Sequence, residues 1–144
     1  MQNTLQESTV PRTRMMAKAT QFCVGLENKP GKLARLCATL REAGVKIEAL
    51  FVSDDEGCTW VNLLVDGNEA AEKALKAADY HFFTEQVLKV LAADGPGRLE
   101  QIAASLAEAD VNINYVYGSC SENAPFTLVL HVSDRDKAAE VLGA

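Results

Sequence analysis

The sequence predicts an α+β fold in which a βαββα(β) unit occurs twice, each copy having an antiparallel sheet with helices on one face. Two observations lead to this prediction. The chain resembles itself at a constant shift, and each copy alternates between the two-residue period of strands and the 3.6-residue period of helices. Because the linker between the copies is very short, we expect them to be packed side by side.

The internal repeat becomes visible when Pro30 is aligned with Pro96, a shift of 66 residues. Between Pro30 and Ser53, ten of the 24 positions are then identical to their counterparts in the second copy. Chance does not readily produce so many identities in register. We therefore expect repeat 1 over residues 18–85 and repeat 2 over residues 86–144, preceded by a flexible arm over residues 1–17.

The first copy begins with a strand around Phe22–Leu26, where apolar residues alternate. Asn28–Gly31 is a turn sequence, and apolar residues then recur at helical spacing as far as Gly44, a residue that favours a helix end. Alternation returns over Val45–Phe51 and predicts a second strand.

The rest of the first copy follows the same rules. Asp54–Gly57 predicts a hairpin turn, and Trp60–Val65 predicts the returning strand. We expect Asn68 to cap a second helix that continues to Ala78. Tyr80–Thr84 then supplies a fourth strand for the first unit.

The second copy repeats the pattern but stops after its last helix. Its predicted strands are Val87–Ala92, Val111–Tyr117 and Phe126–Val132. Ser133 or Asp134 is expected to cap the final helix, and no fourth strand follows. The uncovered sheet edge predicts either a homodimer or a cover formed by the region of Val10, because exposed edges invite pairing.

The crossover from the first strand through the helix to the second strand is expected to be right-handed, which places both helices of a copy on one face of its sheet. That is the ferredoxin-like arrangement.

Composition and charge exclude several functions. The formal net charge of −6 opposes binding to nucleic acid or to anionic lipid, and no apolar run approaches the roughly 20 residues that span a membrane. The chain also lacks a secretory signal, so we expect a cytoplasmic protein with free thiols. Its four cysteines have neither CxxC spacing nor nearby histidines, so no metal site and no cofactor are expected.

Catalytic groups are not expected either. His81 and His131 lie in predicted strands without a matching Ser or Cys motif, and we interpret both as structural. The chain is therefore predicted not to be an enzyme.

The two Pro-Gly turns offer a candidate site for a small anion. A helix N-terminus presents unpaired backbone N–H groups and a partial positive charge, which suit a carboxylate. The amides concerned are those of Gly31, Lys32 and Leu33 in the first copy and of Gly97, Arg98 and Leu99 in the second. Asn28 and Asp94 could orient the amino group of the same ligand. The alternative, that both turns serve only to begin their helices and bind no ligand, stays open.

The turn residues resemble the signature of the ACT domain. Leu26–Leu33 and Glu42–Ile47 look like one example of its Pro-Gly-x-Leu turn, helix and second strand, and Asp94–Leu99 with Ala109–Asn114 look like another. The resemblance covers nearly all of the chain from Ala19 to Gly143.

What the resemblance implies is sensing: members of the family bind free amino acids at the interface between paired modules, usually to regulate an enzyme. Asn28 and Asn112 match the two asparagines of the phosphoglycerate dehydrogenase version, which binds serine, but they lie in different copies. Lys46 stands where the first copy would carry the strand asparagine, and Leu26 where that relative has a histidine, so serine specificity does not follow.

The sequence thus predicts a non-catalytic sensor that binds a free amino acid between its repeats and regulates amino-acid metabolism. The expected ligand-binding residues are Asn28, Lys29, Gly31, Lys32, Leu33, Lys46, Asp94, Gly95, Gly97, Arg98, Leu99 and Asn112. The alternative is a regulatory subunit that docks on a biosynthetic enzyme without binding a ligand itself.

Overall fold

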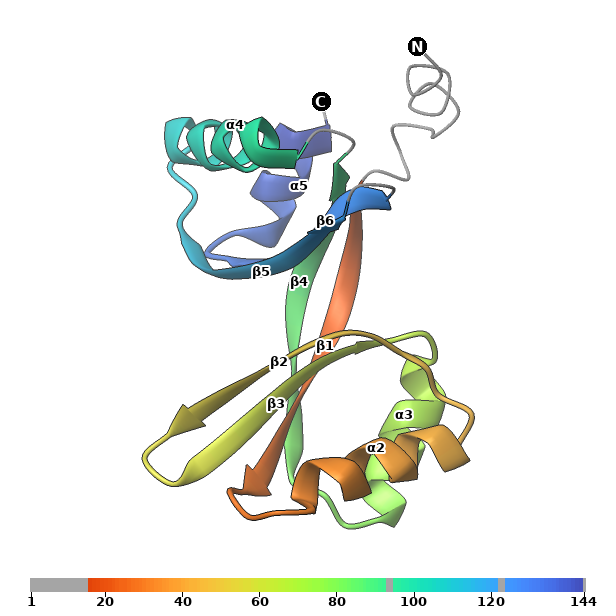
Figure 1. Cartoon of the computed structure of the whole chain (residues 1–144). Helices are drawn as coiled ribbons and strands as arrows, with labels where there is room; N and C mark the ends of the chain where they lie inside the picture. Colours follow the sequence, from red (N-terminus) through yellow and green to blue (C-terminus); the bar gives the residue numbers. More distant parts are fainter. Residues whose placement is uncertain (1–15, 93–94, 122–123, 144) are drawn as a thin grey trace. The chain divides into compact units, whose positions relative to one another are not determined.

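The computed structural model describes residues 16–92, 95–121 and 124–143 (Figure 1). These residues form two compact units, one over Thr20–Glu85 and one that joins residues 86–143 with residues 16–19. Of the predicted arm, only its last two residues are described, and they belong to a strand.

The order of elements confirms the predicted βαββα pattern in both copies. The first copy contains β1 (Met16–Glu27), α2 (Lys32–Glu42), β2 (Ile47–Asp55), β3 (Cys58–Val65) and α3 (Asn68–Ala77). The second contains β4 (Phe82–Ala92), α4 (Gly95–Glu108), β5 (Ile113–Ser121), β6 (Ala124–Val132) and α5 (Arg135–Gly143).

In the unit over residues 20–85, neighbouring strands follow the order β2-β3-β1-β4, and α2 and α3 pack on one face of the sheet (Figure 1). The core between sheet and helices includes Phe22 and Val24 of β1, Leu36 and Leu40 of α2, and Leu75 of α3. The apolar stripes that predicted these helices therefore face the core.

Two local predictions in this unit have different outcomes. The hairpin between β2 and β3 is confirmed: Glu56 and Gly57 have φ angles of 48° and 86°, which suit the tight turns of hairpins. The capping role of Asn68 is wrong, because Gly67 occupies the N-cap of α3 and no side chain there makes a capping hydrogen bond.

In the other unit, the strand order is β1-β4-β6-β5, and its core is formed against α4 and α5. The strand that the second copy lacks is supplied by the first residues of β1, Met16–Ala19, which lie beside β4. The sheet edge therefore needs neither a partner chain nor the Val10 region, which lies outside the described residues. The sequence concealed this strand because residues 16–21 show no clear apolar alternation.

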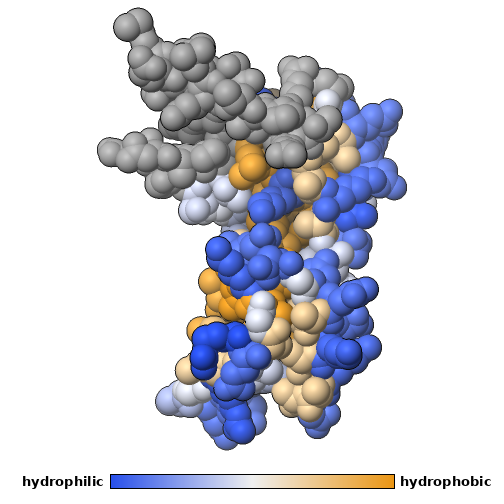
Figure 2. All heavy atoms as spheres, turned by 90° about the vertical axis from the view of Figure 1, so that its right-hand side faces the viewer, coloured by the Kyte–Doolittle hydropathy of each residue, from blue (hydrophilic) through white to orange (hydrophobic). Residues whose placement is uncertain are grey.

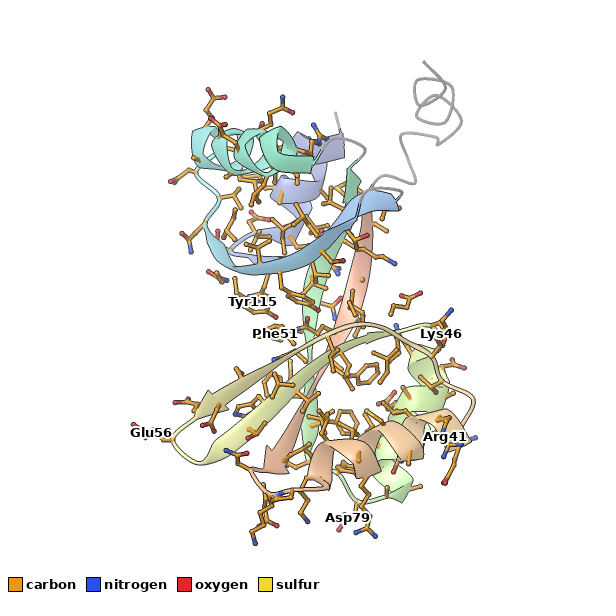
Figure 3. All side chains as sticks on the ribbon, in the orientation of Figure 1. Arg41, Lys46, Phe51, Glu56, Asp79 and Tyr115 are labelled. Atoms are coloured by element: carbon orange, nitrogen blue, oxygen red, sulfur yellow. The ribbon has the colours of Figure 1, made fainter. Side chains whose placement is uncertain are left out.

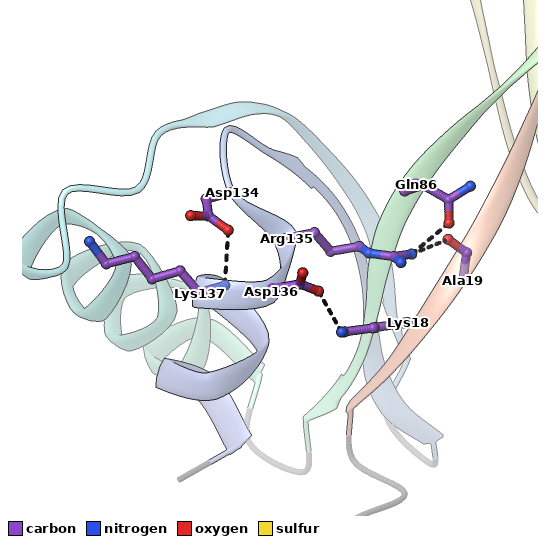
Figure 4. Close-up of polar contacts among 7 residues, drawn as sticks. All are labelled: Lys18, Ala19, Gln86, Asp134, Arg135, Asp136 and Lys137. Atoms are coloured by element: carbon purple, nitrogen blue, oxygen red, sulfur yellow. Dashed lines mark hydrogen bonds and ion pairs between the residues drawn. The ribbon is translucent and has the colours of Figure 1, made fainter.

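Polar contacts attach this strand to α5 (Figure 4). Arg135 donates from Nη1 to the carbonyl oxygen of Ala19 at 3.3 Å and to Oε1 of Gln86 at 2.7 Å. Lys18 forms an ion pair with Asp136 at 2.5 Å. The edge is thus closed by contacts that join the N-terminal strand to the C-terminal helix of the same unit.

The final helix has one of its two predicted caps. Asp134 accepts a hydrogen bond at Oδ1 from the backbone N–H of Lys137, 3.0 Å away, as an N-cap residue does. Ser133 instead uses its hydroxyl to accept from the backbone N–H of Asn112.

In the part of the chain that the structure describes, no helix is long and apolar enough to cross a membrane. Figure 2 shows one face on which hydrophilic side chains predominate and smaller hydrophobic areas lie between them.

Candidate functional site

The predicted loop of the first repeat joins β1 to α2. Gly31 occupies the N-cap of α2 with a φ of 88°, a left-handed conformation that favours glycine. A Cβ at this position would meet no atom within 4 Å, so the backbone angle, and not crowding within the chain, calls for glycine. The loop is exposed, as a ligand site requires.

The two lysines of this loop both lie close to Glu27, which was not among the predicted site residues. Nζ of Lys29 is 3.0 Å from Oε2 of Glu27, and Nζ of Lys32 is 3.9 Å from its Oε1. The hydrogen bond from Lys29, together with the positive charges of both lysines, lowers the pKa of Glu27. Glu27 therefore stays ionised and offsets part of the positive charge of the loop.

Of the three amides predicted to hold a carboxylate here, one is already used. The backbone N–H of Lys32 donates to the carbonyl oxygen of Lys29 at 3.3 Å. The amides of Gly31 and Leu33 donate to no residue in the described part of the chain. An anion at this helix start would therefore meet two amides of the three.

Lys46 lies far from that loop within its own unit. Glu27 pairs with Cys58 at one end of β3, and the residue after Lys46, Ile47, pairs with Val65 at the other end. Seven residues of strand separate the two ends, about 23 Å at roughly 3.3 Å per residue. Figure 3 places Lys46 and the hairpin residue Glu56 at opposite ends of β2 and β3. One repeat alone therefore does not bring the loop and the start of the second strand together.

The corresponding turn of the second repeat differs in its backbone. Helix α4 already begins at Gly95, so Gly97 lies inside its first turn, and its φ is not positive as that of Gly31 is. Leu99 is the fifth helical residue, a position whose amide bonds to the carbonyl four residues earlier. Arg98 donates from Nη1 to Oε1 of Gln101 at 3.2 Å. Asp94 lies outside the described residues.

Asn112, directly before β5, is exposed but held by hydrogen bonds. Its backbone N–H donates to Oγ of Ser133 at 2.9 Å, and its carbonyl oxygen accepts from the N–H of Ser133 at 2.9 Å. Its side chain donates from Nδ2 to Oδ1 of Asn114 at 2.9 Å. Nδ2 of Asn114 in turn lies 3.2 Å from Nδ1 of His131.

Asn114 and His131 were not among the predicted site residues. The spacing of two asparagines at i and i+2 was the available signal, since such residues share one face of a strand. His131 enters the cluster from β6 because it pairs with Tyr115, on which its ring stacks at 4.9 Å between centroids and 15° between planes.

Among the described residues, no three His, Cys, Asp or Glu side chains lie where they could hold a metal ion. Cys23 is buried, and burial together with the nearby Glu85 raises the pKa of its thiol to about 12. Such a thiol stays protonated and is a poor nucleophile. A shallow depression over α3, lined by Glu69, Lys73 and their neighbours, contains none of the predicted site residues.

Comparisons with known proteins agree with the repeat and the fold. A family model described as "ACT domain pair" matches residues 16–143. The chain is similar to protein BT0572 from Bacteroides thetaiotaomicron, with a TM-score of 0.82, 27% identity and coverage of 88% of each chain. No curated protein is significantly similar in sequence.

Two further solved structures are regulatory subunits of aspartate kinase. The subunit from Thermus flavus matches with a TM-score of 0.62 and 15% identity, over 89% of this chain and 92% of that chain. The ligand-free subunit from Thermus thermophilus matches with a TM-score of 0.61 and 14% identity, over 88% and 93%. At such low identity these two likenesses support the fold alone.

Proposed function

Because the chain belongs to the family of ACT domain pairs, we propose that it is a non-catalytic sensor that binds a free amino acid and regulates amino-acid metabolism. The residues offered for binding are those of the loop before α2 in the first repeat and Asn112 in the second, each described within its own unit. The observation that carries this proposal is the match of the family model to residues 16–143.

Each repeat offers groups that suit one end of a free amino acid. In the first repeat, the amides of Gly31 and Leu33 at the start of α2 provide donors for a carboxylate, beside the side chains of Asn28, Lys29 and Lys32. In the second repeat, Asn112 offers its side-chain amide. Its backbone N–H donates to the hydroxyl of Ser133, and its carbonyl oxygen accepts from the N–H of Ser133.

The proposed partner is an enzyme of amino-acid biosynthesis. Two structural neighbours are named as regulatory subunits of aspartate kinase, so the same fold occurs in proteins that act beside an enzyme. A homodimer and a cytoplasmic location stay predictions. The dimer was predicted from an uncovered sheet edge of the second repeat, and β1 covers that edge. The edges that have no neighbouring strand in the strand order are those of β2 and β5.

A thermal-shift screen with each of the twenty amino acids tests the proposal. An amino acid at 100 times its dissociation constant is expected to add about 2.7 kcal/mol to the free energy of unfolding and so to raise the melting temperature. The response is expected to fall in Asn28→Ala and Asn112→Ala. Glu56→Ala, at the exposed hairpin turn, is the matched control.

The second candidate is an interaction module that binds no ligand. It is favoured by exposed apolar side chains on the first repeat, since Leu33, Leu50 and Val52 are 41%, 42% and 47% exposed. A screen without response to any amino acid would support this candidate and contradict the sensor. A response that survives both asparagine substitutions would place the binding site elsewhere.

A further inference from the structure

A directional chain of hydrogen bonds runs through the second repeat from His131 to Asn112. An amide NH₂ group only donates hydrogen bonds, so the contact between Nδ2 of Asn114 and Nδ1 of His131 at 3.2 Å makes Nδ1 the acceptor. A neutral imidazole in this contact carries its proton on Nε2. Stacking on Tyr115 holds the plane of this ring.

The orientation of Asn114 determines that of Asn112. With its NH₂ group directed at His131, Asn114 presents Oδ1 to Asn112, which donates to it from Nδ2 at 2.9 Å. Oδ1 of Asn112 has no hydrogen-bond partner among the described residues and is left as an acceptor. The outward group of Asn112 is thus determined by a histidine that Asn112 does not touch.

We propose that Asn114 and His131 are positioning residues that make Asn112 present its carbonyl oxygen, and not its NH₂ group, to a bound molecule. The second repeat then supplies an acceptor for the ammonium group of the amino acid. This assignment of the ligand group rests on the proposed function, whereas the hydrogen-bond chain itself does not.

The first repeat serves as an internal control because it has the same backbone conformation but lacks this chain of side-chain hydrogen bonds. Lys46 corresponds to Asn112, and its backbone is held in the same way by Asp66, with distances of 2.7 Å and 3.0 Å. Glu48 corresponds to Asn114, and the buried Leu64 corresponds to His131. A lysine side chain donates only, so Lys46 cannot accept a hydrogen bond from an ammonium group.

Nuclear magnetic resonance of the whole chain without ligand tests the hydrogen-bond chain. The side-chain amide signals of Asn112 are expected to shift in Asn114→Ala and in His131→Phe, which keeps a stacking ring. His131→Phe is expected to have no further effect on these signals once Asn114 is alanine. Asn112 signals that stay unchanged in both single variants would overturn the proposal.

Binding then tests the ligand group, with each of the twenty amino acids at about 10 mM and pH 8 as probes in thermal shift. Asn112→Lys, which copies the first repeat, is expected to remove the response, and Asn112→Asp to keep it. Asn114→Ala is expected to weaken binding about tenfold. All three substitutions are at exposed positions, and unchanged melting without amino acid verifies folding.

The two proposals fail in different ways. Asn112 signals that shift in both single variants, with no response to any amino acid, contradict the sensor and leave the proposed hydrogen bonds standing. An amino-acid response that is the same in Asn112→Lys overturns the assignment of the ammonium group and leaves the sensor standing.

Discussion

The two repeats have the same backbone at the junction between first helix and second strand, but they carry different side chains there. In both, a valine between helix and strand donates its backbone N–H to a carbonyl of the last helical turn: Val45 to Leu40 and Val111 to Leu106, each at 2.9 Å. The register shift in the following strand also recurs, between Ile47 and Ala49 and between Ile113 and Tyr115. Duplication thus preserved the contacts that set the chain path, while the exposed positions diverged.

The largest difference between the repeats lies in how each sheet obtains its fourth strand. The first unit uses Phe82–Glu85, which follows its own last helix along the chain, whereas the second uses Met16–Ala19 from the far N-terminus. A chain shortened to begin at Thr20 is expected to lose about 2–4 kcal/mol, through lost ladder hydrogen bonds and lost burial of Met16.

Hydrogen exchange measures where that loss occurs. Amides of residues 86–92 in β4 are expected to exchange faster in the shortened chain, and those of β3 to change less. A chain that begins at Met16 is the matched control and should behave like the whole protein. Equal loss of protection in both repeats would contradict the assignment of this strand to the second unit.

The next difference is at the end of the first helix. Gly44 has a φ of 76°, and its counterpart Asp110 has a φ of 60°, although a left-handed conformation costs a side chain about 1–2 kcal/mol. Gly44→Ala is expected to lower the free energy of unfolding by about 1 kcal/mol, and Asp110→Gly to raise it by about 0.5–1 kcal/mol. Urea denaturation measures both values.

Asp79, with a φ of 62° at the end of α3, provides the control for that pair. Asp79→Gly is expected to stabilise the chain as Asp110→Gly does, because all three helix ends share one geometry. Destabilisation by both aspartate substitutions would mean that the carboxylates contribute more than the backbone strain costs.

The smallest expected effect concerns Cys23, whose counterpart in the second repeat is Lys89. Burial raises the pKa of the Cys23 thiol to about 12, so at pH 8 iodoacetamide is expected to label the exposed Cys58 and not Cys23. Mass spectrometry of peptides from the labelled folded chain measures this. Equal labelling of both would contradict the burial of Cys23.

The same thiol gives stability a dependence on pH. Its pKa in the folded chain lies above that of an ordinary cysteine, so the folded state keeps its proton longer than the unfolded state does. The contribution is therefore complete below about pH 8.5 and is lost as the pH rises toward about 12. Cys23→Ala should remove this dependence.

Much of the fold could be predicted because it is written in local patterns. The alternation over Trp60–Val65 and the helical stripe from Leu33 to Ala43 each depend on neighbours a few residues apart. The candidate site was predicted less completely. The i, i+2 spacing of Asn112 and Asn114 places both on one face, but spacing alone predicts neither their hydrogen bond nor the ion pairs of Glu27.

The sequence by itself determined the duplication, the type of each element and the turns, because periodicity and turn chemistry act over short stretches of chain. Only the tertiary structure decided which strand closes the second sheet and which group orients Asn112. Both depend on residues distant in sequence, Lys18 with Asp136 and Asn114 with His131, whose approach follows from packing of the whole unit.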